Sequence, residues 1–287
     1  MCGIVGILGN HEASPILVDA LKRLEYRGYD SSGIATINDG VLERRREIGK
    51  LVNLADKLVH QPLKGKIGIG HTRWATHGSP TLANAHPQKT GKVAVVHNGI
   101  IENFKKLRDE LISNGANFQS ETDTETIAQL CMSFIDGGDD PKIAAKKTLA
   151  RLEGAYALCF LFHGYDNLLI AARKGSPLAI GHGNGEMFVG SDAIALAPMT
   201  NQVTYLEEGD WAVITRESLE IRDTNGTKIK RSKQTLDLNT QNVAKGNHKH
   251  FMAKAIAEKP SVLADAIQHY LNTSRDKIEI SDLELDF

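Results

Sequence analysis

The chain opens with a short apolar run from Cys2 to Leu8, in which glycine is the only residue type without a hydrophobic side chain. Such a run is typical of a strand that is buried in a sheet. Because the strand begins at residue 2, the sheet would hold the amino terminus and keep it from fraying. We therefore expect a fold in which the chain's first residue is an ordered part of the core.

A cysteine at position 2 has a particular chemical prospect. Aminopeptidases usually remove an initiator Met that precedes a small residue, so Cys2 would then carry a thiol and a free α-amine. The unperturbed pKa is about 7.7–8.0 for the amine and about 8.5 for the thiol. The amine could serve as the general base for its own thiol, directly or through one water. The alternative is that Cys2 is a small hydrophobic residue at the start of a strand, and position alone does not exclude it.

The rest of the chain mixes helical and strand patterns. Apolar residues recur at helical spacing in four segments: 16–24, 51–58, 104–111 and 127–134. Short strand patterns occur throughout, and Asn38-Asp39-Gly40 between two of them is a hairpin turn signal. The regular strand–helix alternation of a Rossmann domain is missing. The pattern favours an α+β domain with two packed sheets.

Composition restricts the possible partners and compartment. Lys and Arg number 34 and Asp and Glu 35, so a net charge of -1 gives no reason to expect nucleic acid or an anionic membrane as a partner. The three cysteines, without a C-x-x-C motif, argue against a disulfide framework and a Cys-based zinc site. No apolar run approaches the roughly 20 residues of a membrane span, and we see no secretory signal. We expect a cytoplasmic protein.

The composition changes near the carboxyl end. Residues 228–249 are polar and charged and are interpreted as a linker. Apolar residues spaced as on one or two helices follow, at positions 251, 256, 262, 267 and 271, interrupted by Lys259-Pro260. The chain stops at Phe287 without room for another domain, so we expect it to be part of a longer protein.

One polar segment, His71 to Gly78, follows a predicted strand and combines cationic and aromatic side chains. Arg73 offers a planar fork that suits a carboxylate. The indole of Trp74 is large and planar and could exclude water from a cleft. A structural loop could also carry both residues as surface side chains.

Two further segments have both a structural and a functional interpretation. Asn98-Gly99 could form a type I′ turn, or the Asn98 amide and the Gly99 N–H could form an oxyanion hole. Asp123 could be a helix N-cap, and it could also hold the ammonium group of a substrate. The sequence by itself leaves these alternatives open.

Other candidates have simple structural interpretations. The spacing of His71, His77, His86 and His97 matches no metal-binding pattern, so no metal is expected. Cys131 and Cys159 are expected in the core. Three consecutive arginines at positions 44–46 are interpreted as a solvated sheet edge.

Taken together, five segments resemble one family. They are Cys2-Gly3-Ile4-Val5-Gly6, residues 27–33, His71 through Gly78, His97-Asn98-Gly99-Ile100 and Glu121-Thr122-Asp123-Thr124. In this order they are similar to the N-terminal glutaminase domain of the glutamine–fructose-6-phosphate aminotransferases, which are class II (N-terminal nucleophile) glutamine amidotransferases. The resemblance covers residues 2–240. It implies that residues 241–287 are a linker and the truncated start of a sugar-phosphate isomerase domain.

The resemblance implies a fold and a catalytic centre. The fold would be the N-terminal nucleophile four-layer αββα sandwich. Cys2 would be the nucleophile, with its own amine as base after Met1 is removed. Asn98 and Gly99 would form the oxyanion hole. No cofactor is implied.

The resemblance also implies how glutamine is bound. Arg73 would bind the α-carboxylate of L-glutamine and Asp123 its α-ammonium group. Three residues would lie on the loop that closes over glutamine: Trp74, Thr76 and His77. Arg27 would support the amino-terminal cysteine.

The expected reaction is hydrolysis of L-glutamine to glutamate and ammonia through a thioester on Cys2. In the full-length enzyme, which we expect to be a homo-oligomer, the ammonia would convert fructose 6-phosphate to glucosamine 6-phosphate. Without the isomerase domain we expect hydrolysis only, by a monomer. The alternatives are the glutaminase domain of another amidotransferase, or a non-catalytic glutamine-binding module if Met1 is retained.

Overall fold

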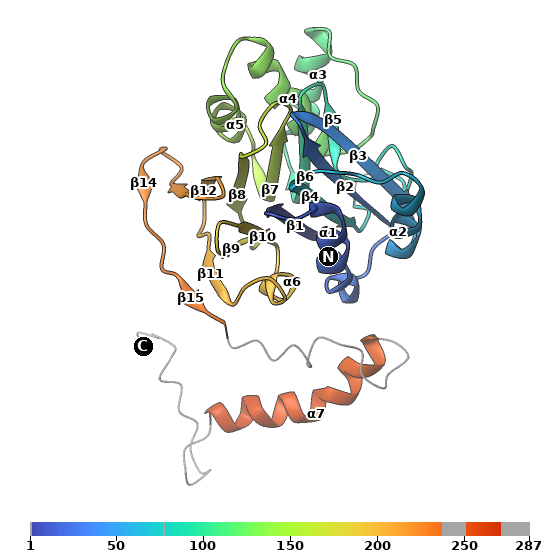
Figure 1. The fold of residues 1–287 in the computed structure, drawn as a ribbon, viewed down its shortest axis with the longest axis vertical. Coiled ribbons are helices and arrows are strands. Elements are labelled where there is room, and N and C mark those ends of the chain that lie inside the picture. Colours follow the sequence, from blue (N-terminus) through green and yellow to red (C-terminus); the bar gives the residue numbers. More distant parts are fainter. Residues whose placement is uncertain (1, 77, 237–250, 271–287) are drawn as a thin grey trace. The chain divides into compact units, whose positions relative to one another are not determined.

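The computed structural model describes residues 2–76, 78–236 and 251–270 (Figure 1). The chain divides into two compact units, residues 1–240 and 241–287. In the second unit the described part is one helix, α7 (Phe251–Tyr270), which continues through Pro260. None of the described helices has the length and apolar character needed to cross a membrane.

The first sheet of the larger unit has the amino-terminal strand near its centre. Its neighbouring strands pair in the antiparallel sense, and β1 lies between β4 and β10. In order across the sheet, the eight described strands are β15 (Gln234–Thr235), β11 (Gln202–Tyr205), β9 (Ala179–His182), β10 (Met187–Gly190), β1 (Gly3–Leu8), β4 (Ile67–Arg73), β2 (Ser31–Asn38) and β3 (Val41–Ile48). The expected opening strand and its position inside a sheet are confirmed.

The second sheet is also antiparallel. Its seven described strands, in order, are β14 (Lys228–Ile229), β13 (Leu219–Arg222), β12 (Trp211–Ile214), β8 (Leu169–Lys174), β7 (Gly154–Phe162), β6 (Val93–Ile101) and β5 (Gln88–Thr90). Between the two sheets lies a core of fully buried side chains from both, for example Ile4 and Ile69 against Val96 and Leu161.

Helices cover the two outer faces of the sandwich (Figure 1). Apolar residues of α1 (Ala13–Lys22), α2 (Leu51–His60) and α6 (Ala193–Leu196) form a second cluster with the first sheet. Those of α3 (Phe104–Ser113), α4 (Asp123–Asp136) and α5 (Pro141–Leu149) form a third cluster with the second sheet. A short 3-10 helix spans Glu25–Arg27. This is the expected four-layer αββα arrangement, and Cys131 and Cys159 are buried within it.

The strands next to the amino terminus are longer than the sequence pattern predicted. β4 continues through Arg73 because it is paired on both sides, with Gly3 opposite Thr72 and Ser31 opposite Arg73. The loop therefore begins at Trp74. The hairpin at Asn38-Asp39-Gly40 forms as predicted, between β2 and β3.

The turn interpretation of Asn98-Gly99 is wrong. Both residues lie inside β6, which pairs with β7 as far as Ile101 opposite Gly154. Gly99 has a φ of +127°, and a Cβ on it would overlap the carbonyl oxygen of Ala155. Glycine is therefore required here by the close approach of two strands.

We predict that Leu161→Ala lowers the free energy of unfolding by about 2–5 kcal/mol, because Leu161 is fully buried between the sheets and its loss leaves a cavity. Leu82→Ala removes the same atoms from a side chain that is 41% exposed and should cost less than about 0.5 kcal/mol. Urea unfolding of both variants measures the difference. Equal losses would contradict the assignment of Leu161 to an inter-sheet core.

Candidate active site

A pocket of about 420 Å³ lies where the ends of β1 and β4 in the first sheet face β6 and the start of α4 in the second-sheet half. Eight residues that the sequence singled out line it: Cys2, Arg27, Arg73, Trp74, Thr76, Asn98, Gly99 and Asp123. His77 lies outside the described residues. Segments as far apart in the chain as Cys2 and Asp123 therefore meet around one cavity.

The Cys2 thiol lies beside Trp74, the first residue of the loop that follows β4. The backbone N–H of Trp74 donates a hydrogen bond to Sγ over 3.2 Å. Burial raises the pKa of the thiol above its ordinary value, although the Trp74 hydrogen bond opposes this. A thiol in this position needs a base to become a thiolate near neutral pH.

The backbone carbonyl of Cys2 is held by two side chains. Asn98 Nδ2 donates to it over 3.1 Å, and Arg27 Nη1 donates over 3.3 Å. Arg27 is itself fixed by an ion pair with Asp192 at 2.7 Å and by a hydrogen bond to the Tyr26 hydroxyl. The orientation of residue 2 is thus set from both sides.

The Asn98 amide is oriented by His71. The Nε2 atom of His71 lies 3.0 Å from the His97 carbonyl oxygen and 3.0 Å from Asn98 Oδ1. Because a carbonyl oxygen can only accept, Nε2 must carry the proton, and the Asn98 atom facing it must be the oxygen. The amide nitrogen of Asn98 then points toward Cys2. Burial lowers the pKa of His71 to about 3, so the ring is neutral.

Two more histidines extend this buried group. His86 stacks on His71 with ring centroids 4.4 Å apart, and its Nε2 contacts Thr124 Oγ1 at 2.7 Å. His97 Nδ1 contacts the same hydroxyl at 3.1 Å. Burial lowers the pKa of His86 well below its ordinary value. Three of the four histidines singled out in the sequence, His71, His86 and His97, therefore form a hydrogen-bonded group that lines part of the pocket.

Arg73 and Asp123 bring opposite charges to the pocket lining. Arg73, at the end of β4, donates to the carbonyls of Gly78 at 3.0 Å and Ser79 at 3.3 Å. Asp123 is the first residue of α4, and its Oδ2 accepts from the backbone N–H of Ile101 over 3.0 Å. The N-cap of α4 is Thr122, so the N-cap interpretation of Asp123 is wrong by one residue.

The loop after β4 is anchored by Asp30, which sequence reasoning did not single out. Its carboxylate accepts a short hydrogen bond from the Ala75 N–H and lies 3.7 Å from Arg73 Nη1. Its backbone N–H donates to the Arg73 carbonyl over 2.7 Å. Trp74 remains 53% exposed, and its indole lies directly over Gly28.

His71 was also missed as a partner of Asn98. Its position in the motif His71 through Gly78 was the available signal, but nothing in the motif indicates that His71 reaches a residue of the other sheet. Ser191 was also missed. It lines the pocket, and its hydroxyl accepts a hydrogen bond from the Ile4 N–H over 3.0 Å.

Comparisons with known proteins agree with this geometry. A family model described as "Glutamine amidotransferase domain" matches residues 71–198. The chain is 55% identical over 287 residues to glutamine–fructose-6-phosphate aminotransferase (isomerizing) of Mesorhizobium japonicum, covering 100% of this chain and 47% of the relative. The corresponding protein of Brucella suis is 54% identical with the same coverage. The chain thus spans about half the length of these curated relatives.

Solved structures give the same result. The glutamine phosphoribosylpyrophosphate amidotransferase of B. subtilis, complexed with ADP and GMP, superposes with a TM-score of 0.69 at 28% identity, over 79% of this chain and 50% of that one. The allosteric regulatory enzyme of purine biosynthesis gives a TM-score of 0.68 at 30% identity, over 78% of this chain and 49% of that one. The chain therefore belongs to the glutamine amidotransferase family and corresponds to the amino-terminal part of the glutamine–fructose-6-phosphate aminotransferases.

Proposed function

We propose that this chain hydrolyses L-glutamine to glutamate and ammonia, with Cys2 as the nucleophile after removal of Met1. The observation that carries the proposal is the arrangement of Cys2, Asn98 and Gly99 around one pocket, with the Asn98 amide nitrogen directed to residue 2. Nucleophile and oxyanion donors in one cavity are what acyl transfer from an amide requires.

The proposed reaction has two steps. The Cys2 thiol gives its proton to the α-amine of the same residue and attacks the side-chain amide carbon of glutamine. The Asn98 Nδ2 group and the Gly99 N–H stabilise the oxyanion that develops. The amine then protonates the departing ammonia, leaving a thioester. Water attacks the thioester, the thiol departs, and glutamate is released.

Substrate recognition in this proposal uses the opposite charges at the pocket lining. Arg73 binds the α-carboxylate of glutamine and Asp123 binds the α-ammonium group. Trp74, Thr76 and His77 belong to the loop that closes over the substrate, and Arg27 supports Cys2. The ion pair between Arg27 and Asp192 and the anchoring of the loop by Asp30 favour these assignments.

The wider assignment follows from the relatives. We propose that residues 2–240 form the glutaminase domain and residues 241–287 a linker and the start of a sugar-phosphate isomerase domain. In a protein with the whole length of the relatives, the ammonia would be used to convert fructose 6-phosphate to glucosamine 6-phosphate. The proposal is supported by the 54–55% identity, over the whole of this chain, to two proteins named glutamine–fructose-6-phosphate aminotransferase.

We predict that Cys2→Ala reduces glutamate release from L-glutamine by at least about 10³-fold, because loss of a nucleophile leaves only binding and the oxyanion hole. A form that retains Met1 should be equally inactive, because its Cys2 amine is part of a peptide bond. Cys131→Ala, at a buried cysteine remote from the pocket lining, should keep its activity. Equal release by all forms would remove Cys2 from the mechanism.

We predict that His71→Phe lowers kcat by about 10–100-fold with little change in KM, because the Asn98 amide loses the donor that orients it. His71→Gln retains an N–H donor and should recover part of the rate. His86→Phe is the matched control, since His86 stacks on His71 but has no hydrogen bond to Asn98. Similar kcat losses in His71→Phe and His86→Phe would assign His71 a merely structural role.

We predict that Asp123→Asn weakens discrimination between L-glutamine and glutaramate, which lacks the α-ammonium group. The asparagine oxygen can still accept from the Ile101 N–H, so the fold should be retained while the charge is lost. A charged hydrogen bond contributes about 1.5–3 kcal/mol, which corresponds to about 10–100-fold in kcat/KM. Steady-state kinetics with both amides measure the ratio. An unchanged ratio would separate Asp123 from ammonium recognition.

A further inference from the structure

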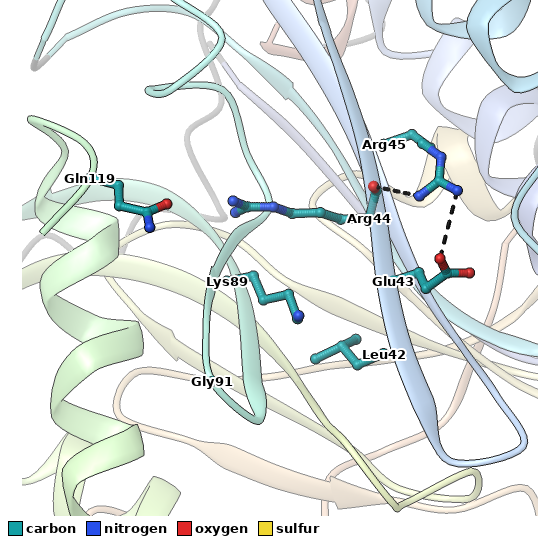
Figure 2. A pocket seen from close by; sticks show the side chains of 7 residues that line it. All are labelled: Leu42, Glu43, Arg44, Arg45, Lys89, Gly91 and Gln119. Carbon is teal, nitrogen blue, oxygen red and sulfur yellow. Dashed lines mark hydrogen bonds and ion pairs between the residues drawn. The ribbon is translucent and has the colours of Figure 1, made fainter. Parts of the chain in front are cut away.

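A second pocket, of about 440 Å³, lies where edge strands of the two sheets face each other. β3 ends the first sheet and β5 ends the second. Arg44 comes from β3, Lys89 from β5 and Gln119 from the segment before α4, and all three extend toward the same gap (Figure 2). This pocket shares no lining residue with the candidate active site.

The alternation of β3 separates its arginines into two environments. Leu42, Arg44 and Arg46 share one face, and Leu42 belongs to the core between the sheets. Glu43 and Arg45 are on the other face, where they pair at 3.7 Å (Figure 2). All three arginines are only partly exposed, and Glu43 and Arg45 also line the pocket. The solvated-edge interpretation does not fit Arg44 and Arg46, which are turned toward the second sheet.

The pocket lining carries more positive than negative charge, because Arg44, Arg45 and Lys89 line it with one carboxylate, Glu43, which pairs with Arg45. Among the described residues, Arg44, Arg46 and Lys89 form no ion pair. Arg44 donates to the Pro87 carbonyl over 3.0 Å, and Arg46 donates to the carbonyls of Ala83 and Ala85. These bonds fix the guanidinium groups but do not neutralise them.

Burial and one nearby carboxylate act on these arginines. Burial lowers the pKa of Arg44, and burial together with the charge of Arg44 lowers that of Arg46 to about 10. Glu125 is the acidic residue that opposes both shifts. Its carboxylate accepts from the backbone N–H groups of Gln119 at 2.8 Å and Ser120 at 2.5 Å, so it is held in place and offsets only part of the positive charge.

We propose that this second pocket binds a dianionic phosphate group, as in a small phosphate monoester. The Arg44 guanidinium offers parallel N–H donors that suit phosphate oxygens, Lys89 supplies a second positive charge, and the Gln119 amide adds a neutral donor. Arg46, on the same face of β3 as Arg44, makes the electrostatic potential of the pocket more positive. The cavity volume leaves room beyond the phosphate for a small organic group. The proposal does not depend on the glutaminase activity.

The test is calorimetric titration of the whole chain with inorganic phosphate at constant ionic strength. The wild type should bind phosphate saturably, and acetate at least about tenfold more weakly. Lys89→Gln and Arg44→Gln should each weaken phosphate binding at least about tenfold, since a charged hydrogen bond contributes about 1.5–3 kcal/mol. Lys22→Gln makes the same charge change at an exposed residue of α1 that lines neither pocket and should leave binding within about twofold.

Three results would overturn the proposal. They are the absence of saturable phosphate binding by the wild type, equal binding of acetate, and equal weakening by Lys22→Gln, which would indicate a general charge effect. Arg44→Gln also removes the hydrogen bond to Pro87, so its circular dichroism is compared with that of the wild type. If that variant is unfolded, Lys89→Gln alone decides, because the described structure gives the Lys89 side chain no hydrogen bond or ion pair.

Discussion

The hydrogen bond from Asn98 Nδ2 to the Cys2 carbonyl is the contact on which the site depends, because it joins the two sheets at the amino terminus. Cys2 precedes β1 of the first sheet, and Asn98 belongs to β6 of the second. The His71–Asn98 bond crosses between the same sheets. The distance between nucleophile and amide is therefore set by the packing of the apolar core, and substitutions in that core act on the site as well as on stability.

Placing polar side chains between packed sheets carries a cost that the structure limits by keeping them uncharged. His71 and His86 are buried and have strongly lowered pKa values, and their Nδ1 atoms have no hydrogen-bond partner in the described structure. A neutral ring nitrogen left without a donor costs far less than a buried imidazolium. The paired Nε2 atoms, in contrast, fix the Asn98 amide and the Thr124 hydroxyl. The two histidines thus leave their Nδ1 atoms without a hydrogen bond, while their Nε2 atoms give the Asn98 amide and the Thr124 hydroxyl a defined orientation.

The sequence was sufficient for features that depend on local pattern or on a motif. The buried opening strand, the hairpin at residues 38–40 and eight of the residues that line the pocket are predicted by such patterns and motifs. It failed where pairing between distant segments overrides local preference. Asn98-Gly99 is a strong turn signal, yet β7 continues the ladder past it. The pattern predicted Arg44 to be an exposed edge residue. The register of β3 against β2 decides which face of β3 meets the second sheet, and three consecutive arginines do not indicate that register.

The start of α4 connects the two pockets. Gln119 lies at the basic pocket and Asp123 at the candidate active site, and the backbone between them is held at several points. Glu125 accepts from two successive N–H groups, Thr122 caps the helix, and Asp123 accepts from β6. A segment fixed in this way resists displacement, since each hydrogen bond broken in a buried setting leaves a polar group unpaired. The residues that this segment contributes to the two pockets are therefore held by one hydrogen-bonded stretch of backbone.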